Sequence, residues 1–225
     1  MFLDISIPYS PQVPVWPGDV PFSCGWTARR EDGANINLGA VTCSTHAGTH
    51  ADAPLHVDSA GAASESLPLV PFVGESCVIA RPPGTAIDAP ITLLMLHSMV
   101  SQAMRRAVVK APPRLLCRTG CSVSSGAFPD AWPALETDAV AWLVSSGIVL
   151  WGIDAPSVDV RTSKTLPVHH ALFASGAFVL ENLALDGVTV GEYELLAQPL
   201  AIVGADAAPV RAILRPLQRT IPLGR

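Results

Sequence analysis

The sequence predicts an α/β protein, folded as a single compact domain over residues 1–225 with a mixed β-sheet and flanking helices. The chain has 225 residues, of which 49% are hydrophobic, enough to bury one substantial core. Short apolar runs typical of strands alternate along it with segments of helical periodicity. Several connections between these segments are short, which favours a mixed sheet over a purely parallel one.

The first half of the chain is expected to be rich in strands. Apolar runs predict strands at residues 2–7, 22–27, 36–44 and 75–80. Four prolines stiffen the loop after the first strand, and they can hold Trp16 in one orientation. Trp16 could either contact a ligand or cover the core. A lone tryptophan more often covers the core. Pro82-Pro83-Gly84 ends the fourth strand.

The second half alternates helices with strands. Helical patterns predict helices at residues 91–107, 136–146 and 167–175, and apolar runs predict strands at 114–117, 148–153 and 177–180. Gly147 is a suitable C-cap for the second helix. The continuous apolar run at 148–153 is typical of a strand covered on both faces. Arg118, just after a buried strand, could bind a substrate carboxylate or form a structural salt bridge.

Charge and cysteine content exclude several classes of function. The net charge is −5 and no block of basic residues occurs, so nucleic acids and anionic membranes are poor partners. No apolar run reaches the roughly 18 residues of a transmembrane helix, and Asp4 near the start argues against a secretory signal. Five scattered cysteines, an odd number, indicate free thiols in a reducing compartment. We expect a cytoplasmic protein.

One stretch, His46-Ala-Gly-Thr-His50-Ala-Asp52-Ala-Pro-Leu-His56, contains three of the six histidines. Its four candidate ligands all occupy even positions, so an extended chain would direct them to one face. A helix is the weaker alternative, because the intervening glycine and proline break helices. The sequence therefore predicts a cluster of imidazoles and a carboxylate on one side of an extended segment.

This cluster has the composition of a metal site. A straight strand would separate the α-carbons of residues 46 and 52 by about 20 Å, whereas metal–ligand bonds are only about 2 Å long. If His46, His50 and Asp52 share one ion, the segment must bend, and Gly48 is the obvious position. Imidazoles with a carboxylate and no thiolate suit zinc or manganese in a catalytic site. The alternative is a run of surface histidines in a loop.

His169 and Glu181 form a second pair of candidates, twelve residues apart. Glu181 follows an apolar strand, where an isolated carboxylate is costly to bury unless it is paired or bound to a metal. A salt-bridged glutamate and a helix-capping histidine are the structural alternative. Together with the first cluster, the pair provides enough ligands for two metals that share a bridging carboxylate. His56 would then be free for proton transfer.

The histidine stretch resembles the signature of the metal-dependent cyclase family, and more closely that of its bacterial kynurenine formamidase (arylformamidase) members. The resemblance extends over nearly the whole chain. Its further landmarks are Trp16-Pro-Gly-Asp19, Arg118-Thr-Gly120, Gly152-Ile-Asp-Ala-Pro-Ser-Val-Asp159, Ser163-Lys-Thr-Leu166, His169-His170 and Leu180-Glu-Asn182. The resemblance implies a swivelling β/β/α architecture and a homodimer.

The resemblance also implies two zinc ions per subunit, with manganese as an alternative. His46, His50 and Asp52 would bind one ion and His169 the second, while Asp52 bridges and Glu181 contacts both. By the same resemblance, His56 would be the general acid/base and Trp16 a substrate contact.

The implied reaction is hydrolysis of N-formyl-L-kynurenine to L-kynurenine and formate in tryptophan degradation. A zinc-bound hydroxide would attack the formyl carbon, and His56 would pass its proton to the departing aryl amine. Two alternatives stay open. One is another hydrolase of the same family, such as an isatin hydrolase, and the other is a non-catalytic metal-binding protein.

Overall fold

A mixed sheet forms the central layer of the protein in the computed structural model, which describes residues 2–104 and 113–217. Within these residues it has seven strands in the order β1-β11-β9-β5-β6-β7-β8. The strands are β1 (Leu3–Asp4), β5 (Val73–Ala80), β6 (Arg114–Arg118), β7 (Leu150–Ile153), β8 (Phe178–Leu180), β9 (Gly191–Leu196) and β11 (Ile213–Pro216). Strands β5 to β8 run parallel and the others pair antiparallel. The predicted mixed sheet is confirmed.

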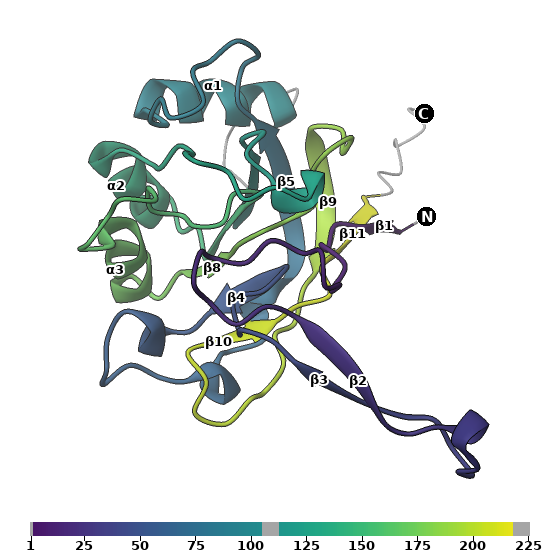
Figure 1. Cartoon of the computed structure of the whole chain (residues 1–225). Helices are drawn as coiled ribbons and strands as arrows, with labels where there is room; N and C mark the ends of the chain where they lie inside the picture. The colour runs from purple at the N-terminus through teal and green to yellow at the C-terminus, as the bar shows by residue number, and fades with distance from the viewer. Residues whose placement is uncertain (1, 105–112, 218–225) are drawn as a thin grey trace, which may run out of the picture.

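Helices cover one face of this sheet (Figure 1). In the described part of the chain they are α1 (Leu93–Met104), α2 (Thr137–Ser145) and α3 (Pro167–Ala174). Leu115 and Cys117 of β6 pack into the core beneath the helices, whereas Leu116 between them belongs to the core on the opposite face. The three helices match the predicted ones, although residues 105–107 of the first prediction lie outside the described residues. None of the described helices is long and apolar enough to cross a membrane.

A small second sheet covers the opposite face. Strand β4 (His50–Asp52) pairs antiparallel with β10 (Ala207–Pro209). Ala51 of β4 packs with Leu116 and Leu183 in the core between the two sheets. Gly152 permits this close approach, because a Cβ there would lie 2.5 Å from Leu116 Cδ2 and 2.8 Å from Leu183 Cδ1. The layers are therefore β/β/α, as the resemblance implies.

A β-hairpin, which we call the arm, projects away from the body (Figure 1). It consists of β2 (Ser23–Ala28) and β3 (Leu38–Thr42), close to two predicted strands. Trp26, Leu38 and Val41 are each more than half exposed on it. An isolated two-stranded hairpin is at best marginally stable, and these apolar side chains lack the burial that would stabilise it.

The described residues also form short 3₁₀ turns at Arg30–Asp32, Pro54–His56, Ser64–Ser66, Val70–Phe72 and Val123–Ser125.

Candidate metal centre

Two distant segments meet at the edge of the central sheet, where β8 ends. Backbone hydrogen bonds join His50 to Glu181 in both directions, with N–O distances of 3.3 and 3.0 Å. The Thr49 hydroxyl donates to the carbonyl of Asn182 at 2.6 Å. Asn182 has φ +54°, a left-handed conformation that asparagine tolerates better than most residues. These contacts seat β4 beside the end of β8, so the two predicted ligand clusters converge.

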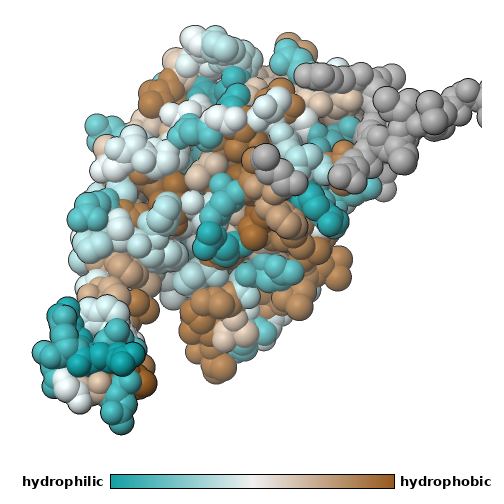
Figure 2. All heavy atoms as spheres, turned by 90° about the vertical axis from the view of Figure 1, so that its right-hand side faces the viewer, coloured by the Kyte–Doolittle hydropathy of each residue, from teal (hydrophilic) through white to brown (hydrophobic). Residues whose placement is uncertain are grey.

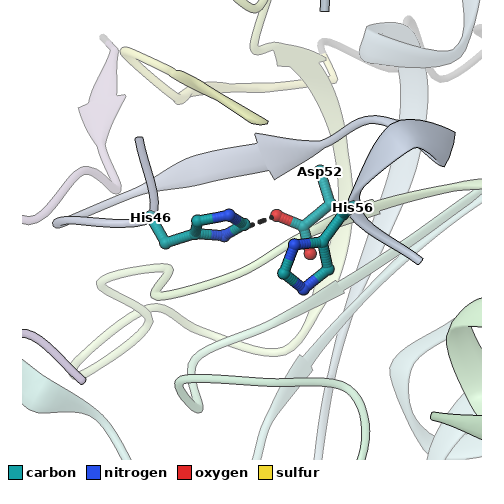
Figure 3. Close-up of side chains that lie close together, drawn as sticks. All are labelled: His46, Asp52 and His56. Atoms are coloured by element: carbon teal, nitrogen blue, oxygen red, sulfur yellow. Dashed lines mark ion pairs between the residues drawn. The ribbon is translucent and has the colours of Figure 1, made fainter. Parts of the chain in front are cut away.

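The histidine stretch is extended and bent where the sequence predicts. Strand β4 directs His50 and Asp52 to one face, and Gly48 bends the chain with φ +59°. A Cβ at Gly48 would lie 3.3 Å from the ring of Tyr9. Beyond the bend, His46 Nδ1 lies 3.1 Å from Asp52 Oδ1, and Figure 3 shows this ion pair.

The second cluster supplies His169 and Glu181 from the other side. His169 Nε2 lies 3.0 Å from Asp52 Oδ2 and 3.3 Å from Glu181 Oε1. His50 Nε2 lies 3.4 Å from Glu181 Oε2. His50, Asp52, His169 and Glu181 are each at most 3% exposed, whereas the neighbouring His170 is exposed. The geometry thus brings together His169, not His170, with the first cluster.

Hydrogen bonds to backbone groups and to Asp159 hold three of these four side chains in place. Asp159 accepts hydrogen bonds from the backbone N–H groups of Val168 and His169, and from His169 Nδ1 at 2.7 Å. His50 Nδ1 donates to the carbonyl of Gly48 at 2.9 Å. Glu181 Oε1 accepts from the Val158 N–H at 2.8 Å. In His50 and His169, a hydrogen bond therefore fixes Nδ1, and Nε2 points toward the carboxylates of the cluster.

Strong electrostatic coupling follows from this packing. Burial opposes charge on the His169 ring, but Asp159, Asp52 and Glu181 outweigh it and raise its pKa to about 12. Burial likewise opposes charge on His50, yet Asp52 and Glu181 raise its pKa to about 9. Burial favours the neutral form of Asp52, but His46 and His169 hold the pKa of that carboxyl well below its usual value.

The residues present fit a divalent metal. His50 Nε2 and Asp52 Oδ1 are fully buried and make no hydrogen bond within the described residues, an arrangement that a cation between them would satisfy. Among residues 2–104 and 113–217, two groups have ligand atoms within 4.8 Å of one another: His46, Asp52 and His56, and His50, Asp52 and Glu181. Imidazole nitrogens with carboxylate oxygens are the donors that zinc and manganese accept.

The open side of the centre contains a carboxylate that the sequence analysis does not predict. Asp206 Oδ2 lies 2.9 Å from His46 Nε2 and 3.3 Å from His56 Nδ1, and its Oδ1 accepts from the Thr45 hydroxyl. The hydrogen bond from His46 and the one from Thr45 lower the pKa of Asp206. Asp206 is the one charged residue in the apolar run 199–210, a signal that could have identified it. His56 lies beside both Asp52 and His46 (Figure 3).

A cavity of about 320 Å³ opens above His46, His56 and Glu181. Trp16 lines it at 41% exposure, with its ring 5.5 Å edge-on from Phe128 and 5.7 Å from the buried Trp132. Trp16 therefore covers part of the core and also faces the cavity, and its contact with a substrate stays a prediction. The cavity lining is Pro14, Val15, Trp16, Asp19, His46, His56, Phe128, Pro156, Ser157, Val160, Arg161, Ser163, Leu166, Glu181 and Asn182.

Arg118 has a different role from either that the sequence suggests. Its Nη1 donates to the carbonyl of Val188 at 2.7 Å, and its side chain is not part of the cavity lining. Arg118 therefore ties the end of β6 to a neighbouring loop.

Comparison with known proteins identifies the family. The model of the Cyclase family matches residues 3–160, more than half of the chain. The chain belongs to the Cyclase family. Among Cyclase relatives, the kynurenine formamidase of Salinibacter ruber is 44% identical over 215 residues, which are 95% of this chain and 96% of that protein. The kynurenine formamidase of Bordetella avium is 42% identical over 214 residues, 95% and 97% of the two chains.

Solved Cyclase-like structures agree with the fold. A potential metal-dependent hydrolase with cyclase activity superposes with TM-score 0.76 at 28% identity, over 95% of this chain and 96% of that one. Isatin hydrolase A from Labrenzia aggregata reaches TM-score 0.79 at 24% identity, over 95% and 93%, and at that identity it supports the fold alone. The metal-dependent neighbour and the His/Asp/Glu groups together support a metal cofactor for this Cyclase-family protein.

Proposed function

We propose that this protein hydrolyses N-formyl-L-kynurenine to L-kynurenine and formate, as a kynurenine formamidase. One observation carries the proposal. Four buried side chains, His50, Asp52, His169 and Glu181, converge below a cavity with an aromatic wall, in a chain that is 44% identical to a kynurenine formamidase.

We infer that the centre holds two divalent ions, zinc or alternatively manganese, bound by His46, His50, Asp52, His169 and Glu181. The two oxygens of Asp52 support a bridging role, because Oδ1 faces His46 and His50 whereas Oδ2 faces His169. Glu181 is similarly divided, with Oε1 toward His169 and Oε2 toward His50. Bound ions would supply a nucleophile at neutral pH and a Lewis acid for the formyl oxygen.

His56 acts as the proton-transfer group in this proposal. Its ring is 29% exposed and lines the cavity, and its Nδ1 faces Asp206. The opposite ring nitrogen, Nε2, can accept a proton during attack and return it to the nitrogen of the departing aryl amine. Asp206 orients the ring in the way that a carboxylate orients a catalytic histidine. His56 also lies within one candidate ligand group with His46 and Asp52, so its separation from the metals is itself a point to test.

Trp16 would contact the aryl ring of the substrate. Its indole is half-exposed in the cavity wall, and it packs edge-on against Phe128, which leaves an aromatic surface for a flat ring. N-formyl-L-kynurenine has such a ring next to its formamide.

A homodimer and a cytoplasmic location stay predictions. Trp26, Leu38 and Val41 on the arm favour a partner subunit, because exposed apolar side chains gathered on one ribbon are typical of interfaces. Figure 2 shows further hydrophobic surface on the body beside the arm. Sedimentation analysis would test the dimer.

The decisive experiment combines metal analysis with an activity assay. We expect two zinc or manganese ions per chain, and formate release from N-formyl-L-kynurenine that a chelator abolishes and added metal restores. Isatin serves as the competing substrate. Faster hydrolysis of isatin than of N-formyl-L-kynurenine would favour an isatin hydrolase. If neither substrate is hydrolysed in a chelator-sensitive way, the proposed activity is wrong.

A further inference from the structure

We propose that Arg161 binds the α-carboxylate of the substrate's amino-acid end and so makes the enzyme selective for an amino-acid formanilide. This inference rests on the proposed function and extends it, because the ligand cluster explains hydrolysis but not the choice of substrate. N-formyl-L-kynurenine carries a zwitterionic amino acid at the end of a short side chain, whereas isatin and simple formanilides carry none.

Arg161 belongs to the same cavity as the candidate catalytic group. It lines the cavity together with His56 and Trp16. Its guanidinium carbon lies 5.6 Å from the centre of the Phe128 ring, and Phe128 packs edge-on against Trp16. The guanidinium therefore adjoins the aromatic wall, where the side chain of an aryl substrate would extend.

Most of the hydrogen-bonding capacity of Arg161 is available. Its Nη1 contacts the carbonyl of Pro129 at 3.3 Å and Asp130 Oδ1 at 2.9 Å. Its Nε and Nη2 make no hydrogen bond within residues 2–104 and 113–217. A guanidinium has five N–H donors in a planar fork, so the free edge can receive a carboxylate through two parallel hydrogen bonds.

The existing ion pair with Asp130 does not compete strongly with such a ligand. The Asp130 side chain is fully exposed to solvent, while that of Arg161 is 31% exposed. Ion pairs between solvent-exposed groups contribute little free energy. A ligand carboxylate inside the cavity would be better shielded from water, and its hydrogen bonds to the guanidinium would be correspondingly stronger.

Charge across the cavity matches a zwitterion. Asp19 also lines the cavity, so its carboxylate can attract the α-ammonium group while Arg161 holds the α-carboxylate. Apart from the histidines, the charged side chains among the described lining residues are Asp19, Arg161 and Glu181. Glu181 belongs to the ligand cluster, which leaves one acid and one base for the two charges of an amino acid.

The test compares Arg161→Met with the wild-type holoenzyme on two substrates. Met keeps an apolar stem over Phe128 and removes the charge. For N-formyl-L-kynurenine we expect kcat/KM to fall about 10- to 100-fold, mainly through KM, the loss typical of a hydrogen bond to a charged group. For 2-formamidoacetophenone, which has the same formanilide without the amino acid, we expect no change. Arg161→Lys should retain part of the binding.

Asp130→Ala separates ligand binding from a structural role. It breaks the same ion pair but keeps the guanidinium, so KM for N-formyl-L-kynurenine should stay unchanged or decrease. If Asp130→Ala and Arg161→Met raise KM equally, the ion pair supports the cavity wall and the inference is wrong. Arg215→Met is the matched control, because Arg215 on β11 pairs with Glu194 on β9 and is not part of the cavity lining.

Calorimetry with L-kynurenine tests Arg161 without relying on turnover. We expect Arg161→Met to weaken L-kynurenine binding about tenfold or more and to leave 2-aminoacetophenone binding unaltered. Equal effects on both ligands, or no effect on either, would overturn the inference. A wild-type enzyme that binds L-kynurenine through Arg161 but does not cleave N-formyl-L-kynurenine would contradict the proposed function alone.

Discussion

The floor and the rim of the cavity differ in how their side chains are held. On the floor, His50, His169 and Glu181 are buried, and each is fixed by a backbone group or by Asp159. On the rim, His46 and His56 are 21% and 29% exposed and share one partly exposed partner, Asp206. A buried floor suits metal ligands, whereas the rim combines one further proposed ligand, His46, with His56, which is accessible for proton exchange.

The largest expected effect comes from the floor. Asp52→Ala removes the carboxylate that faces three imidazoles, so both metal content and activity should be lost. The fall in kcat/KM should exceed the roughly 100-fold typical of losing an outer partner of a ligand. Metal analysis and formate release provide the measurements, and Asp58→Ala, an exposed residue in the following loop, is the control. Two metals still bound per chain would rule out a bridging Asp52.

His56→Ala tests whether a rim residue contributes to catalysis without binding the metals. Metal content should stay at the wild-type value while kcat falls about 10²- to 10⁴-fold, the usual contribution of a general acid/base. His97→Ala, at an exposed ring packed against Trp142, should leave both unchanged. If the His56→Ala variant keeps the wild-type kcat, His56 is not a catalytic residue. If the variant loses one metal ion per chain, His56 is a metal ligand.

Asp159→Asn probes how the floor is fixed. The amide keeps the size of the side chain but weakens its hold on His169 Nδ1, so metal affinity should fall about 10- to 100-fold. Competition with a chromogenic chelator measures this affinity. An affinity equal to that of the wild type would show that the α3 backbone alone orients the ring.

Asp206→Asn should have the smallest effect. If Asp206 only orients His56, loss of its charge should slow formanilide cleavage about fivefold, as for a partly exposed ion pair. Cleavage of p-nitrophenyl formate should change less, since its phenolate leaves without a proton donor. Equal slowing of both substrates would mean that Asp206 acts through His46 and the metals.

Local sequence determined the helices, the strands up to residue 180 and the shape of the histidine stretch, whereas β9 and β11 of the central sheet carried no strand prediction. Alternation with a period of two placed His50 and Asp52 on one face, and Gly48 was the obvious position for the bend. The parallel strands β6, β7 and β8 also agreed with their apolar runs. Such features depend on neighbours in the chain, so they can be predicted from spacing and residue type.

The tertiary structure alone decided which groups outside the two predicted ligand clusters meet them. Asp206 reaches His56 because β10 pairs with β4, and strands of three residues are too short to leave a periodic signal. Asp159 and Arg161 were likewise visible in the sequence, but their partners, His169 Nδ1 and the cavity, come from packing. Backbone pairing and the close approach at Gly152 set these positions, because contacts between remote residues depend on how whole layers stack.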